Sequence, residues 1–118
     1  MRIGGLTLAA ALLCAATEAQ AQVAFDCSGT IATGGVAQTI ITASGSVHGF
    51  MIMNLSTNLM WISVTGTAAA NGTGSFSLNP AAATSAGGSF STPVNIGPNV
   101  SLSVVSANNG DRYSCARW

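Results

Sequence analysis

Residues 100–118, VSLSVVSANNGDRYSCARW, contain the clearest structural signal in this chain of 118 residues. Their first half alternates apolar residues with serines, which is the pattern of a strand that has one apolar and one polar face. Asn109-Gly110 then supplies a two-residue turn, and residues 112–117 resume the strand pattern on its far side. The pattern predicts an antiparallel hairpin at the end of the chain.

The same kind of sequence extends toward the N-terminus as far as residue 23. β-branched residues are frequent, glutamate and lysine are missing from this part, and glycine or asparagine interrupts it every several residues. A second turn is predicted at Asn71-Gly72. Strands are predicted near residues 23–28, 36–43, 46–55, 59–66, 74–79, 88–92, 99–106 and 111–117. Short strands with turns at this spacing predict an all-β fold, a small antiparallel β-sandwich or a jelly-roll-like domain.

Residues 1–21 have the three parts of a secretory signal peptide. Arg2 gives the positively charged start, residues 3–16 give the apolar stretch, and Ala19-Gln20-Ala21 gives the small residues that a signal peptidase requires. The stretch is shorter than the roughly 20 residues of a spanning helix, which favours cleavage over an uncleaved membrane anchor. We therefore expect an exported bacterial protein, periplasmic, extracellular or at the cell surface, in which residues 22–118 form one domain without a further membrane span.

The three cysteines divide between the leader and the domain. Cys14 allows an alternative in which the chain is a lipoprotein with a lipid attached to this cysteine. Leu13 precedes it, however, whereas a lipoprotein peptidase prefers a small residue at that position. In either case Cys27 and Cys115 remain, and two cysteines in an exported chain predict one disulfide. The bridge would close a loop of about 90 residues, for which chain entropy gives about 4.5 kcal/mol of stabilisation. Each cysteine shares its strand face with an aromatic residue, Phe25 or Tyr113, so we expect a bridge inside an apolar cluster that ties the first strand to the last.

Charge is almost absent from residues 22–118, where the charged side chains are Asp26, Asp111, Arg112 and Arg117. Two arginines cannot neutralise the many phosphates of a nucleic-acid site, and they are too few for electrostatic attachment to an anionic lipid surface. Partners are therefore expected to be met through hydroxyl groups, amides, apolar patches and backbone. Self-association, another surface protein and a glycan are the candidates.

The residues that catalysis would need are scarce. Any catalytic triad must use His48, the one histidine, and no Gly-x-Ser-x-Gly nucleophile elbow accompanies it. Glycosidase chemistry would have to pair Asp26 with Asp111, yet Asp111 is also placed to pair with Arg112 or to cap the turn. One histidine and two distant cysteines are too few for a metal site. We therefore expect no enzymatic activity, no metal and no cofactor.

Trp61 is a candidate contact residue. Met60 and Ile62 form the consistent apolar face of its strand, so alternation places Trp61 on the opposite, outer face. An outward tryptophan on a nearly uncharged surface suits a protein contact or a sugar platform. The alternative is that a loop covers this face.

The segment 46–55 is apolar on both faces. Phe50 and Ile52 lie on one face, whereas the other has Val47, Met51, Met53 and Leu55. Two apolar faces indicate either a central strand or an interface. Phe50, Ile52 and Trp61 are therefore the candidate contact surface.

The sequence from residue 50 onward resembles small β-domains in the structural proteins of tailed bacteriophages and prophages. The residues that show the likeness are FMIMNLSTNLMWISVTGTAAANGTGSFSLNP, then GGSF, and the closing VSLSVVSANNGDRYSCARW. The resemblance implies a β-sandwich that serves at a virion surface or in assembly, with no catalytic residues. The predicted leader and disulfide differ from those domains and indicate an exported relative on a bacterial surface.

Two functional hypotheses follow. The first is a non-catalytic structural or assembly domain at a bacterial cell or phage-like particle surface, which associates with itself or with another surface protein. The alternative is a secreted adhesive or glycan-binding module that uses Trp61 and the polar loops.

Overall fold

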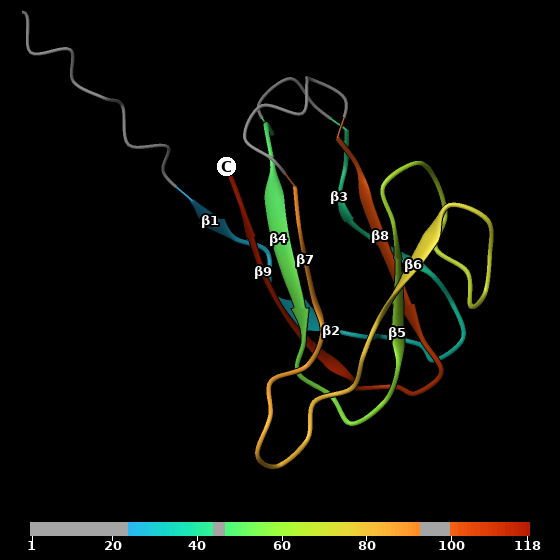
Figure 1. The fold of residues 1–118 in the computed structure, drawn as a ribbon. Coiled ribbons are helices and arrows are strands. Elements are labelled where there is room, and N and C mark those ends of the chain that lie inside the picture. Colours follow the sequence, from blue (N-terminus) through green and yellow to red (C-terminus); the bar gives the residue numbers. More distant parts are fainter. Residues whose placement is uncertain (1–23, 44–46, 93–99) are drawn as a thin grey trace, which may run out of the picture.

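The computed structural model describes residues 24–43, 47–92 and 100–118, and Figure 1 shows that they form two facing β-sheets. No helix in these ranges is long and apolar enough to cross a membrane. The predicted leader, residues 1–21, lies outside the described residues.

Nine strands form these sheets within the described part of the chain, and every pairing is antiparallel. The first sheet contains, in spatial order, β1 (Phe25–Asp26) with β2 (Gly29–Thr30), β9 (Arg112–Arg117), β4 (Phe50–Asn54) and β7 (Ser89–Ser91). The second sheet contains β3 (Gln38–Ile41), β8 (Leu102–Ser106), β5 (Met60–Ser63) and β6 (Ser75–Leu78).

β1 and β2 behave as one interrupted strand. Both pair with β9 in a single register, in which Phe25 lies opposite Arg117 and Thr30 lies opposite Arg112. Counted in this way, each sheet has four strands, and the chain changes sheet at every connection except the one between β5 and β6. This strand order is that of a jelly roll. The predicted all-β antiparallel sandwich is therefore confirmed.

The predicted C-terminal hairpin is wrong. β8 and β9 are consecutive, but β8 belongs to the second sheet and β9 to the first. Each is a central strand that pairs on both sides: β8 pairs with β3 and β5, and β9 pairs with β1/β2 and β4. Neither strand therefore has a free edge with which to pair with the other. The turn at Asn109-Gly110 carries the chain between the sheets, and the positive φ of Gly110 (79°) permits its sharp bend. The turn predicted at Asn71-Gly72 does join two paired strands, β5 and β6.

The core lies between the two sheets. Each central strand turns alternate apolar side chains inward, and these are almost completely buried. They include Phe50 and Ile52 from β4, Met60 and Ile62 from β5, Leu102 and Val104 from β8, and Tyr113 and Cys115 from β9. Complete burial of an aliphatic or aromatic side chain contributes roughly 1.5–3 kcal/mol. This core is therefore the main stabilising element of the domain.

The two long sides of the sandwich are closed differently. On the side of β7 and β6, Phe90 stacks between Phe50 and Phe76, with ring centroids 5.9 Å and 5.7 Å away. On the side of β2 and β3, the Gln38 side chain donates to the Tyr113 hydroxyl (3.3 Å) and to the Thr30 carbonyl (3.0 Å). One side is therefore held by aromatic contact and the other by hydrogen bonds.

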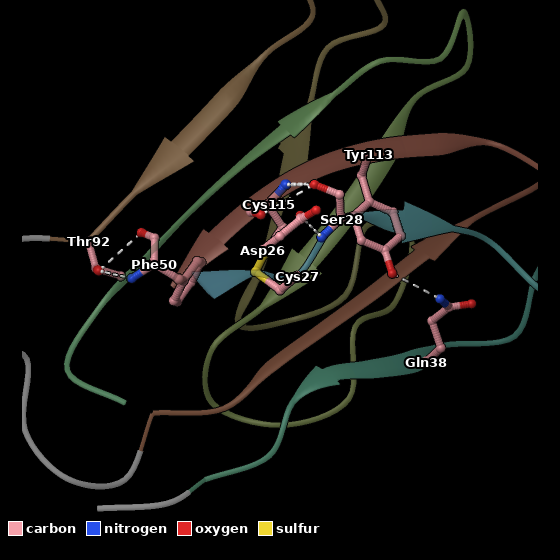
Figure 2. Close-up of a disulfide and its surroundings, with 8 residues drawn as sticks. All are labelled: Asp26, Cys27, Ser28, Gln38, Phe50, Thr92, Tyr113 and Cys115. Atoms are coloured by element: carbon pink, nitrogen blue, oxygen red, sulfur yellow. Dashed lines mark hydrogen bonds between the residues drawn. A yellow bond between two sulfur atoms is a disulfide. The ribbon is translucent and has the colours of Figure 1, made fainter. Parts of the chain in front are cut away.

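The disulfide between Cys27 and Cys115 is present, as predicted, and joins directly opposed positions at the break between β1 and β2 (Figure 2). Their Cα atoms are 4.7 Å apart, within the usual range. Cys115 is buried in the apolar core. The expectation that Phe25 also lies inside is wrong, because β1 is at the edge of the first sheet and Phe25 is 59% exposed there.

Ser28 supplies hydrogen bonds at the interruption between β1 and β2, where the regular backbone pairing with β9 is broken. Its hydroxyl accepts the Cys115 N–H (2.8 Å), and its own N–H donates to the Asp26 carboxylate (2.8 Å), as Figure 2 shows. The hydroxyl and the backbone N–H of Ser28 lower the pKa of Asp26. The short break between the two strands therefore keeps its polar groups paired.

Candidate functional site

Phe50 and Ile52 are core residues and do not form a contact surface. Both side chains are 0% exposed, because β4 turns this face toward the second sheet. The prediction that they contact a partner is therefore wrong. Alternation could not decide which face is inside, since both faces of this strand are apolar.

The outer face of β4 is the exposed one. Met51 is 44% exposed, Leu55, just beyond the strand, is 42% exposed, and Met53 is half-buried. The cross-strand neighbours of Met51 and Met53 on β9 and β7 are serine or alanine, including Ala116 beside Met51, whereas Arg112 is the next residue on β9 opposite Leu55. These small neighbours leave the longer side chains prominent. We call the surface formed by Met51, Met53, Leu55 and Ala116 the methionine face.

Two charged residues border the methionine face. Asp26 lies directly across the ladder from Ala116, and Arg112 lies on the same face of β9, four residues earlier. Side chains of opposed residues in a sheet point to the same face. Among the described residues, no other charged side chain lies on this face of the first sheet. The face is therefore neutral overall, with one acid and one base at its borders.

Trp61 lies on the outer face of the second sheet, as alternation predicts. Met60 and Ile62 on either side of it are completely buried, whereas Trp61 is half-buried. Its neighbour across the ladder on β8 is Val105. Both residues line a hollow with a volume of about 490 Å³.

Four connections form the walls of this hollow. Gly35 comes from the β2–β3 connection, Asn58 and Leu59 from the β4–β5 connection, Ala68–Ala70 from the β5–β6 connection, and Ala107 and Asn108 from the β8–β9 connection. Hydrogen bonds hold two of them against the sheet. The Gly35 N–H donates to the Ser106 carbonyl (2.7 Å), and the Ala68 N–H donates to the Ser103 hydroxyl (3.0 Å). Loops therefore surround the tryptophan without filling the space above it.

A buried polar network fixes one end of the hollow. Asp111 is buried, and its carboxylate accepts hydrogen bonds from the Ser106 hydroxyl and from Asn58 Nδ2 (2.8 Å). The Asn58 carbonyl in turn accepts from Asn54 Nδ2 (2.7 Å), at the end of β4. Asp111 thus caps the β8–β9 connection, which is one of its two predicted roles. The network ties the ends of β4 and β8 to the start of β5.

The residues considered for catalysis lie apart. His48 is exposed just before β4, and its backbone N–H bonds to the Trp118 carbonyl. Asp26 lies opposite Ala116, whereas Asp111 lies five residues away at the other end of β9. At about 3.4 Å per residue the two carboxylates are about 17 Å apart, well beyond the roughly 5–10 Å of a glycosidase pair. The fold does not assemble this pair into a site.

The hollow was missed by sequence reasoning, although Trp61 at its floor was found. Its walls come from segments that are far apart in the sequence, so the only available signal was the run of small residues Ala68–Ala70. No family model, curated protein or solved structure matches the chain. Glycan binding through Trp61 stays a prediction.

Proposed function

We propose that the chain is an exported, non-catalytic structural or assembly domain, displayed at the surface of a bacterial cell or a phage-like particle. The methionine face carries this proposal. Contiguous apolar side chains on the outside of a small domain mark contact sites, because leaving them in water is unfavourable. The disulfide supports export, since such bonds persist in oxidising compartments.

A second copy of the chain fits this face best. The domain has almost no net charge, so like-charge repulsion between copies is small. Asp26 and Arg112 are about 14 Å apart, from strand and residue spacings, and they have opposite signs. In a two-fold pairing of the methionine faces, Asp26 of each copy can therefore meet Arg112 of the other.

Sedimentation velocity over a concentration series tests this proposal. The wild-type protein is expected to form a reversible dimer. The double variant Met51→Gln/Leu55→Gln removes exposed apolar side chains without touching the core, and it should weaken the dimer at least tenfold, since each buried side chain contributes about 1–2 kcal/mol. Phe76→Gln is the control, because Phe76 is 49% exposed at the β6–β7 side, where it stacks on Phe90 and is not part of the methionine face, so this change should leave association unchanged.

A charge exchange identifies the pairing. Asp26→Arg alone should weaken the dimer by placing two cations together, and Asp26→Arg/Arg112→Asp should restore it. A protein that stays monomeric at the highest concentrations, or a dimer that responds only to Phe76→Gln, would contradict self-assembly through the methionine face.

A further inference from the structure

The hollow over Trp61 is lined mainly by apolar side chains. Trp61, Val105 and Leu59 supply the larger surfaces, and Ala68–Ala70 supplies small ones. None of its lining residues is charged. Transfer of an apolar molecule from water into the hollow is therefore favourable, whereas an ionic group on that molecule would find no charged partner there.

Of the three asparagine and serine side chains in the lining, Asn58 and Ser106 already make hydrogen bonds within the protein. Asn58 Nδ2 donates to Asp111, and the Ser106 hydroxyl bonds to Asp111 and to the Leu59 carbonyl (3.3 Å). Asn108, which is exposed, lies at the rim. A sugar needs several donors and acceptors around its hydroxyl groups, whereas an apolar ring needs few or none.

We propose that this hollow is a binding site for a small, uncharged molecule made largely of one or two apolar rings. Its volume of about 490 Å³ falls in the range of small-molecule sites, roughly 300–1,000 Å³. Trp61 and Val105 form the floor on which the rings rest, and the Asn108 amide at the rim is available for one polar substituent.

The site is built before the ligand arrives. The Ala68 and Ala69 N–H groups are held by the hydroxyls of Ser103 and Ser75, both at 3.0 Å. The Gly35 N–H is held by a carbonyl of β8. Binding to fixed walls avoids the cost of ordering loops. The small side chains of Ala68–Ala70 keep the space open, so a larger side chain there should occupy it.

This inference is independent of the proposed assembly function. The hollow lies on the outer face of the second sheet, whereas the methionine face lies on the outer face of the first. Loss of ligand binding and loss of self-association can therefore be produced by different substitutions.

Fluorescence titration with the uncharged probe N-phenyl-1-naphthylamine tests the site. The chain has two tryptophans, so Trp118→Phe leaves Trp61 as the single reporter. The probe is expected to bind with saturable one-to-one stoichiometry, to gain emission, and to quench Trp61. Ala70→Phe in the same background should weaken binding at least tenfold, because its ring takes up space in the hollow.

Phe76→Ala is the matched control, since it removes an exposed aromatic side chain outside the hollow and should leave probe affinity unchanged. Trp61→Ala, read by probe emission, should also weaken binding, and circular dichroism establishes that each variant is folded. Absence of saturable binding, or equal affinity in Ala70→Phe and the parent protein, would overturn the proposal. Binding to a glycan array that depends on Trp61, without probe binding, would likewise overturn it in favour of a sugar site.

Discussion

At the scale of single residues, Gly29 shows how the first sheet accommodates a large side chain. It lies directly opposite Tyr113 on β9. A Cβ atom at Gly29 would be 2.7 Å from the Tyr113 hydroxyl oxygen and 3.1 Å from the ring carbon that carries it. Tyr113 can therefore lean over the glycine and reach Gln38, the contact that closes this side of the sandwich.

Gly29→Ala is expected to lower the free energy of unfolding by about 1–3 kcal/mol, the usual cost of overpacking a core. Urea denaturation followed by fluorescence measures the change. Gly66→Ala is the control, because a Cβ atom there meets no atom within 4 Å. Equal stability of the two variants would show that Tyr113 does not need this space.

The role or the position of a single residue was predictable where its chemistry, or the alternation of apolar and polar residues, allowed only one interpretation. Cys27 and Cys115 were the only pair available in the domain, and Trp61 followed from the buried residues on either side of it. Phe50 could not be placed, because its strand is apolar on both faces. Phe25 fits the inward alternation, but its exposure depends on the position of β1 at the edge of the sheet, which no local pattern contains.

At the scale of elements, every predicted strand region contains an observed strand, with ends that differ by a few residues. Strand pairing was harder to predict. The turn at Asn109-Gly110 has ordinary hairpin residues, yet β8 and β9 separate into different sheets because each has two other partners. A turn sequence specifies a local bend, whereas pairing is decided by which strands bury each other's apolar faces.

The disulfide acts at this same scale, because it joins β9 to the interrupted edge strand β1/β2 across 88 residues of sequence. Cys27→Ala/Cys115→Ala should lower the free energy of unfolding by about 4 kcal/mol, mainly by freeing the unfolded chain. Chemical denaturation of the variant, and of the wild type with and without reductant, measures this. Stability that is unchanged by both treatments would show that the ladder alone holds the edge strand.

At the scale of the whole molecule, the jelly-roll order brings the first and last strands together. Phe25 pairs with Arg117, so the start of β1 lies beside the end of β9. The β6–β7 connection is exposed at Ala83 and Thr84. A domain whose first and last described strands are adjacent, and which has an exposed loop elsewhere, permits the order of its segments to be changed without changing the fold.

A circular permutant that joins residue 118 to residue 24 through a short glycine-serine linker, and begins at Thr84, is expected to fold with the native disulfide. Its far-UV circular dichroism spectrum should match that of the wild type. Its unfolding should be cooperative, with a free energy of unfolding within about 2 kcal/mol of the wild-type value, since a short linker closes at little entropic cost. A second permutant opened between Ile62 and Ser63, inside β5, should fail to fold. Folding of both would show that β5 need not be continuous.

The central position of β9 in the first sheet also determines the order in which the strands can pair as the chain is synthesised. β9 is the last of the described strands in sequence order, and β1 and β2 pair with no other described strand of their sheet. β1 and β2 must therefore wait until residues 112–117 have been made, as long-range pairings generally do. In the export proposed above, this late closure would leave the chain unfolded for longer before it crosses the membrane. The disulfide between Cys27 and Cys115 can then form only late in folding, after β9 has paired with β1 and β2, and it stabilises that pairing once it has formed.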